Sequence, residues 1–136
     1  MSVPSFSSPD DAGRRFAVIA ESLYLANLLI APGLAFLGLL WLWRRADVRA
    51  LPLARQHLRQ TVVASLWAGA LLVGLSAIIL LIGALGGDSA SMWSWFAVIL
   101  YFIVFHSTLV LCGMVGLSRA IAGQPFRFPV IGPGPA

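Results

Sequence analysis

Long apolar runs separated by short polar segments set the pattern of this chain. The runs cover residues 16–43, 61–85 and 93–117. A helix needs roughly 20 apolar residues to cross the hydrocarbon core of a bilayer, so each of the last two runs predicts one transmembrane helix. The pattern as a whole predicts an all-α integral membrane protein with a single membrane domain, residues 1–136.

The first run allows two arrangements, because Pro32 and Gly33 interrupt it. One kinked helix over residues 16–43 would cross the bilayer, whereas a hairpin that turns at Pro32 and Gly33 would be re-entrant or tilted and covered by other protein. If Arg14 and Arg15 lie in the cytoplasm like the later arginines, the run must enter and return, which favours the hairpin. Length favours the single span. We predict a kinked or re-entrant helical hairpin before the two transmembrane helices.

A polar tail, residues 1–8, precedes the first helix. Ser8 can cap a helix, Pro9 suits its first position, and Asp10 and Asp11 suit the positive end of the helix dipole. The segment 9–43 is therefore predicted to start as an amphipathic helix near Pro9.

Arginines mark the polar segments that follow. Residues 44–60 form an Arg-rich cytoplasmic loop by the positive-inside rule, and Pro52 interrupts it before a helix restarts. The spacing places Arg55, Gln56, Arg59 and Gln60 on one polar face of that helix. The loop at residues 86–92 holds Asp88 as its single charge and is predicted to be non-cytoplasmic, whereas the tail, residues 118–136, returns to the cytoplasmic side. Lipid or interface contacts are predicted for Arg44, Arg45, Arg49, Arg55, Arg59, Trp93, Trp95, Phe126, Arg127 and Phe128.

The composition fits a lipid-embedded protein, with 60% hydrophobic and 10% charged residues. Soluble domains average about a quarter charged residues. All nine basic residues are arginine, and the net charge is +4. Because these arginines flank the apolar runs, they indicate membrane orientation and anionic lipid rather than nucleic acid. The predicted partners are membrane lipids and a larger membrane protein complex or a second copy of the chain.

Few residues within the runs can carry chemistry. A single histidine such as His106 can ligate haem or a pigment, but Phe102 stands where a macrocycle would need a small residue, so hydrogen-bonded packing is favoured. Glu21 is expected at the membrane interface near Arg14. Cys112 lies deep in an apolar run and is expected to pack. No cofactor, metal site or catalytic residue is predicted.

Small residues form two faces at helical spacing, and small faces let helix backbones approach closely. The residues are Ser65, Gly69, Ala70, Gly74 and Ala77 in the second run and Thr108, Cys112 and Gly116 in the third. They predict packing of the two helices on each other or docking of a partner subunit, and the sequence leaves both open.

The segment after the last run is predicted to leave the helix sharply. Gly123 is expected to end the helix in a left-handed conformation. Two prolines then favour an extended path, in which Phe126 and Phe128 point one way and Arg127 the other. We expect the rings in the membrane interface and the guanidinium at a phosphate or an acidic partner.

Three segments carry a resemblance: NLLIAPGLAFLGLLWLWRRAD, LPLARQHLRQTVVASL and SRAIAGQPFRFPVIG. They resemble a family of small bacterial membrane proteins of unknown function, distantly related to the chloroplast inner-envelope protein-import channel component. The resemblance runs from about Leu23 onward, and His57 and Gln60 coincide with polar positions of that family. It implies a helical bundle with both termini in the cytoplasm and brings no catalytic residues.

These observations predict a non-catalytic small subunit or assembly factor that packs against a larger complex in the bacterial cytoplasmic membrane, which it crosses more than once. One alternative is a component of a translocation or transport path, and a second is a cofactor-holding subunit that uses His106. The sequence lacks a Ser-His-Asp order, a phosphate-binding glycine loop and paired carboxylates at membrane depth, which argues against an enzyme.

Overall fold

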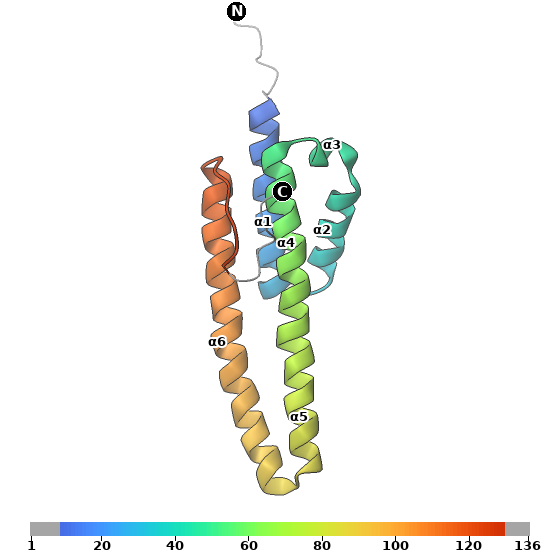
Figure 1. The fold of residues 1–136 in the computed structure, drawn as a ribbon, viewed down its shortest axis with the longest axis vertical. Helices are drawn as coiled ribbons and strands as arrows, with labels where there is room; N and C mark the ends of the chain where they lie inside the picture. Colours follow the sequence, from blue (N-terminus) through green and yellow to red (C-terminus); the bar gives the residue numbers. More distant parts are fainter. Residues whose placement is uncertain (1–8, 130–136) are drawn as a thin grey trace, which may run out of the picture. The chain divides into compact units, whose positions relative to one another are not determined.

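The computed structural model describes residues 9–129, and every regular element in that range is helical. In chain order the elements are α1 (Pro9–Leu29), α2 (Leu34–Arg44), α3 (Ala46–Arg49), α4 (Pro52–Gly69), η1 (Ala70–Leu75), α5 (Ser76–Leu85) and α6 (Asp88–Ile121) (Figure 1). The chain divides into two compact units. Unit 1 contains the residues up to Ser65 and those from Cys112 onward, and unit 2 is Leu66–Leu111.

The predicted all-α class with two long apolar helices is confirmed. Pro52–Leu85, which includes α4, η1 and α5, and Asp88–Ile121 are each 34 residues long and apolar enough to cross a membrane. Both are longer than predicted, because the helices continue into their polar flanks. α4 begins at Pro52, where a helix was predicted to restart within the segment 44–60, and only Gly86 and Gly87 separate α5 from α6.

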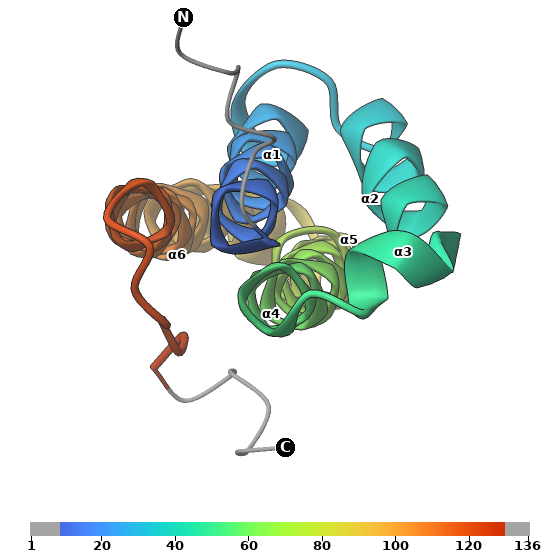
Figure 2. The ribbon, with the colours of Figure 1, turned by 90° about the horizontal axis from the view of Figure 1, so that it is seen from above.

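The first apolar run is divided into two helices at Pro32. Gly33 has a φ of 85°, and its N–H donates to the Asn27 side-chain oxygen at 2.9 Å. α1 and α2 then lie side by side (Figure 2), so closely that a Cβ on Gly38 would meet the Leu23 side chain at 3.4 Å. That this helix pair enters the membrane as a re-entrant hairpin stays a prediction.

The core of unit 1 draws on α1, α2, α3, α4 and the segment after α6. Its buried members are Ala20, Tyr24, Leu39, Leu42, Val48, Ala54, Leu58, Ala64 and Phe128. Because Phe128 is one of these core residues, the segment after α6 has to fold back onto the first helices.

Two glycines let α6 approach α1 within unit 1. A Cβ on Gly113 would lie 2.7 Å from atoms of Tyr24 and Leu25, and one on Gly116 would lie 2.6 Å from the Glu21 Oε2. Because the later glycine meets the earlier α1 residue, the two helices run antiparallel here. Glycine is required at this contact, since a side chain at either position would push the helices apart.

Unit 2 is held together by a second close approach and by a hydroxyl. A Cβ on Gly83 would collide with the Ser94 side chain, so α5 and α6 touch near their connection. η1 is a π-helical segment, and the Tyr101 hydroxyl donates to its Leu71 carbonyl oxygen at 2.7 Å. That contact satisfies a carbonyl in an irregular helical turn.

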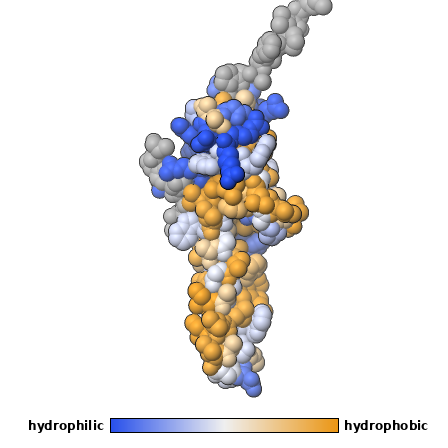
Figure 3. Space-filling model, turned by 90° about the vertical axis from the view of Figure 1, so that its right-hand side faces the viewer, coloured by the Kyte–Doolittle hydropathy of each residue, from blue (hydrophilic) through white to orange (hydrophobic). Residues whose placement is uncertain are grey.

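Hydrophobic side chains cover most of the visible surface of unit 2 (Figure 3). Val73, Ile82 and Phe96, for example, are 70%, 66% and 69% exposed. A soluble protein rarely exposes so large an apolar surface, so this unit is suited to lipid or to partner helices. Hydrophilic side chains gather instead over the Arg-rich segment of unit 1.

The α1–α6 approach predicts opposite outcomes for two glycine substitutions. Gly113→Ala should destabilise the detergent-purified protein by about 1–3 kcal/mol, because its Cβ has no room against Tyr24 and Leu25. Gly69→Ala is the matched control, since a Cβ there meets nothing within 4 Å, and it should be neutral or stabilising by up to about 1 kcal/mol. Thermal unfolding of both variants checks this, and equal melting temperatures would contradict the close packing.

Candidate functional site

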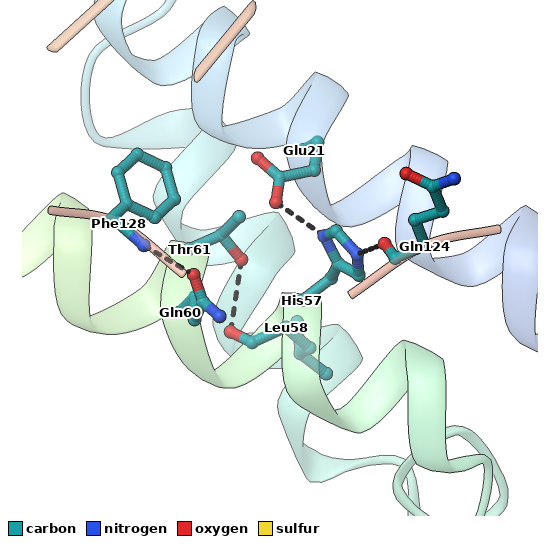
Figure 4. A network of polar contacts seen from close by, with 7 residues as sticks. All are labelled: Glu21, His57, Leu58, Gln60, Thr61, Gln124 and Phe128. Atoms are coloured by element: carbon teal, nitrogen blue, oxygen red, sulfur yellow. Dashed lines mark hydrogen bonds and ion pairs between the residues drawn. The ribbon is translucent and has the colours of Figure 1, made fainter. Parts of the chain in front are cut away.

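A cluster of buried polar side chains lies inside unit 1. Glu21 comes from α1, and His57, Gln60 and Thr61 come from α4; each is at most 3% exposed (Figure 4). Buried polar groups are costly unless they are hydrogen-bonded. The cluster therefore has to be explained by the bonds that its members make.

His57 lies at the centre of the cluster and joins three parts of the chain. Its Nδ1 is 2.7 Å from the Glu21 Oε1, and its Nε2 is 3.0 Å from the backbone carbonyl oxygen of Gln124 (Figure 4). The imidazole thus connects α4 to α1 on one side and to the segment after α6 on the other.

These two partners fix how many protons the pair of His57 and Glu21 carries. A carbonyl oxygen only accepts, so the Nε2 of His57 carries a proton and donates it. The short contact with Glu21 needs a second proton between Nδ1 and Oε1, either as imidazolium with carboxylate or as imidazole with carboxylic acid. In both forms the pair is neutral overall, which is the form that a buried site tolerates best.

The other carboxyl oxygen of Glu21 faces the backbone of α6. Its Oε2 is buried without a hydrogen-bond partner among the described residues, and it lies where a Cβ on Gly116 would stand. Glu21 lies outside both long apolar helices, and burial raises the pKa of its carboxyl while the hydrogen bond from His57 opposes that shift. The glycine makes room for this carboxyl group within the helix contact.

Gln60 holds the C-terminal segment a second time. Its side-chain oxygen accepts the backbone N–H of Phe128 at 2.9 Å (Figure 4). One turn after His57, the Thr61 hydroxyl donates to the Leu58 carbonyl oxygen at 3.1 Å. Side chains of His57 and Gln60 therefore bind backbone groups at both ends of the segment from Gln124 to Phe128.

The segment reaches α4 because α6 ends sharply at Gly123, as predicted. Gly123 has a φ of 68°; its N–H donates to the Ala120 oxygen and the Gln124 N–H to the Arg119 oxygen, which is the Schellman arrangement. The chain then turns back with Phe126 and Phe128 on the inner side and Arg127 exposed.

The aromatic rings of the segment contact protein. Phe128 is 1% exposed and packs edge-on against Tyr24, with ring centroids 5.2 Å apart, and Phe126 packs on Phe128 at 5.3 Å. The alternation read from the sequence is therefore present. Where the sequence placed the Phe128 ring in the membrane interface, the structure has it in the core of unit 1.

Two sequence expectations about this region are wrong. Glu21 was expected at the interface beside Arg14, but it is fully buried and bound to His57. Gln60 was expected on a polar face with Arg55, yet it is 3% exposed, because the face of α4 that holds His57 and Gln60 turns into the core. The available signal was the spacing of His57, Gln60 and Ala64, which continues an inward-facing stripe with polar members.

His106 lies in unit 2, whereas the polar cluster belongs to unit 1. Its ring stacks on that of Phe102 with centroids 5.2 Å apart and an interplanar angle of 11°. Its Nδ1 is buried without a hydrogen-bond partner among the described residues. No group of three His, Cys, Asp or Glu side chains in residues 9–129 could hold a metal ion, and both ring nitrogens of His57 are already engaged.

The small residues are used unequally. Ser65, Gly116 and, in part, Cys112 are covered by unit 1, whereas Gly69, Ala70, Ala77 and Thr108 are exposed and Gly74 is half-buried. A Cβ on Gly69 or Gly74 would meet nothing within 4 Å. The described part of the chain therefore leaves the face of Gly69, Ala70, Gly74 and Ala77 open; we call it the open small face.

The residues predicted at the membrane interface are mostly exposed. Exposed side chains are Arg44, Arg49, Arg55, Trp93, Trp95 and Arg127, and Arg45 and Arg59 are half-buried. Arg45 pairs with Asp47 at 2.6 Å, and its guanidinium also lies over the rings of Phe16 and Trp41. The hydrogen bond from the guanidinium lowers the pKa of the Asp47 carboxyl. An exposed pair of this kind adds little stability.

The cluster predicts a large penalty for losing its central side chain. His57→Ala should destabilise unit 1 by about 3–5 kcal/mol, because it leaves the buried Glu21 unpaired and frees the Gln124 carbonyl. Thermal unfolding in detergent measures the loss, and limited proteolysis near Arg127 should become faster because the segment is released.

Gln56→Ala is the control for that variant, since Gln56 is the exposed neighbour of His57. It should change neither melting nor proteolysis. Gln60→Ala should cost less than His57→Ala, about 1–3 kcal/mol, because only the Phe128 N–H loses its partner. A His57→Ala protein as stable as Gln56→Ala would show that the cluster does not hold the fold.

Comparison with known proteins gives one match. The model of the MamF/MmsF family, described as the magnetosome magnetite crystal formation protein family, matches residues 13–134. No curated protein and no solved structure matched the chain.

This match covers nearly the whole chain and corrects the resemblance inferred from the sequence. It assigns a bacterial family of small membrane proteins, as expected, but not a relative of the chloroplast import channel component. Together with the two long apolar helices, it identifies a membrane protein. The chain belongs to the MamF/MmsF magnetosome magnetite crystal formation family.

Proposed function

We propose that this protein is a non-catalytic, multi-pass protein of the bacterial inner membrane that packs against a larger membrane protein complex and through it serves magnetite crystal formation. The family description supports the crystal-formation part. The open small face of unit 2 is the observation that carries the packing part. An apolar helix with unfilled space above its glycines is the surface that a partner helix needs for close approach.

The division of labour among the small residues supports this reading. Side chains of the chain itself occupy the space above three glycines: Ser94 lies over Gly83, Tyr24 and Leu25 lie over Gly113, and Glu21 lies over Gly116. Gly69 and Gly74 have nothing over them. Glycine costs helix stability, by about 1 kcal/mol relative to alanine, so glycines that no internal contact uses are best explained by an external one.

The arginines support the orientation. Arg44, Arg49 and Arg55 are exposed near the start of α4, whereas the α5–α6 connection carries Asp88 as its single charge. By the positive-inside rule, α4 begins in the cytoplasm and the connection lies across the membrane. Arg119 and Arg127 then return with the end of α6 to the cytoplasmic side.

The polar cluster supports a structural role for unit 1 in place of chemistry. Both ring nitrogens of His57 are engaged by Glu21 and Gln124, the Gln60 oxygen accepts from Phe128, and the unpartnered Oε2 of Glu21 is buried against α6, so no described member of the cluster presents an exposed nucleophile or base to a substrate. The cluster fixes the C-terminal segment against α4 within unit 1.

The proposal predicts that enlarging the open small face breaks association. Ala70→Leu and Ala77→Leu should remove the co-purifying partner or the higher-mass species, because each fills the space into which a partner helix would pack. Size-exclusion chromatography and mass spectrometry of material from native membranes measure this. In a magnetite-forming host that lacks its own copy, these variants should fail to restore crystal formation.

Ala97→Leu is the matched control, since it adds the same atoms to an exposed alanine of α6. It should leave the association unchanged. If the control Ala97→Leu also loses the partner, or if Ala70→Leu and Ala77→Leu keep it, the open small face is not the docking surface. If the wild-type protein does not change crystal formation in the host that lacks its own copy, the proposed cellular role is wrong, while the packing result still stands.

A further inference from the structure

We propose that a groove between α1 and the C-terminal part of α6 binds one anionic phospholipid, with the phosphate at Arg14 and Arg15 and an acyl chain along Val18, Ile19 and Ile121. This inference rests on the membrane location and not on the packing partner. It gives unit 1 a defined lipid ligand.

The groove consists of two adjoining hollows. The first, of about 390 Å³, is lined by Arg14, Arg15, Val18, Ile19 and Ile121. The second, of about 250 Å³, is lined by Met114, Leu117, Ser118 and Ile121. Ile121 borders both, so the second hollow adjoins the first and continues along the face of α6, which alone lines it.

The register of the two helices orders the groove from charged to apolar. Arg14 meets Gly123, and Glu21 meets Gly116, so α1 and α6 run antiparallel along it. The arginines therefore lie at the end where α6 stops, and Met114 lies at the other. From Ile121 to Met114 the helix rises about 10 Å, which offers an acyl chain a continuous apolar wall.

Charge complementarity selects the headgroup. The lining of the two hollows contains two guanidinium groups and no carboxylate; Arg14 also lines a neighbouring hollow near Pro52, together with Asp10 and Asp11. Guanidinium groups bind phosphate oxygens through paired, charge-assisted hydrogen bonds. Basic pockets between helices on the cytoplasmic side are known to suit anionic lipid headgroups.

The apolar wall selects a lipid over a free anion. Ile19, Ile121 and Met114 are 43%, 57% and 56% exposed, so this wall is uncovered in the described chain. Inorganic phosphate would use only the arginines, whereas a phospholipid uses both ends of the groove. A lipid that fills it would cover the exposed side of the α1–α6 contact that depends on Gly116.

Native mass spectrometry of the full chain in detergent tests the groove. The delipidated protein should retain one phosphatidylglycerol more strongly than phosphatidylcholine. The double variant Arg14→Gln/Arg15→Gln should weaken that retention about tenfold, the loss expected when charge-assisted hydrogen bonds are removed. Ile121→Ser should weaken it as well, and excess inorganic phosphate should not displace the lipid.

Arg44→Gln/Arg49→Gln is the matched control, since these arginines are exposed and do not line the groove. It should leave the single retained lipid in place. Equal retention of both lipids, an equal loss in the control, or a change of oligomeric state in place of lipid loss would overturn the inference. A protein absent from the membrane fraction would overturn the proposed membrane function itself.

Discussion

The buried contact between His57 and Glu21 is the constraint on which unit 1 depends. It places an ionisable pair where water cannot reach, and only a shared proton and the Gln124 carbonyl make that tolerable. The need to enclose this pair also constrains α6 and the segment that follows it. α6 must come close enough to enclose Glu21, which only glycine at position 116 allows, and the chain must reverse at Gly123 to supply the carbonyl.

The two units answer different physical demands. Unit 1 pairs His57, Gln60 and Thr61 internally and buries rings such as Tyr24 and Phe128, as a water-soluble core would. Unit 2 has few buried side chains and a largely apolar surface, which is how a protein looks when lipid or another helix completes its packing. In this member of the family, unit 1 therefore packs on itself, whereas the apolar surface of unit 2 is suited to lipid or a partner helix.

The sequence predicted much of the fold and little of the site. Apolar length and punctuation by Pro9, Pro32 and Gly123 set the helices, because these signals act locally. The site was missed because its logic is not local: Glu21 and His57 are 36 residues apart, and Gln60 and Phe128 are 68 apart. Nothing in a stretch such as RQHLRQ shows which polar side chains turn inwards, since that depends on where distant helices arrive. The distant-family resemblance was misassigned for a related reason, as short apolar motifs resemble one another across membrane proteins.

The discontinuity of unit 1 has a consequence for biosynthesis. Residues up to Ser65 leave the ribosome first, but their core is completed by the segment around Gln124 and Phe128, which is made only after Leu66–Leu111. At roughly 5–20 residues per second, several seconds pass between the two. During that interval Leu66–Leu111 is synthesised while Glu21 and His57 lack the Gln124 carbonyl. Unit 1 can therefore close only after all of unit 2 has been made.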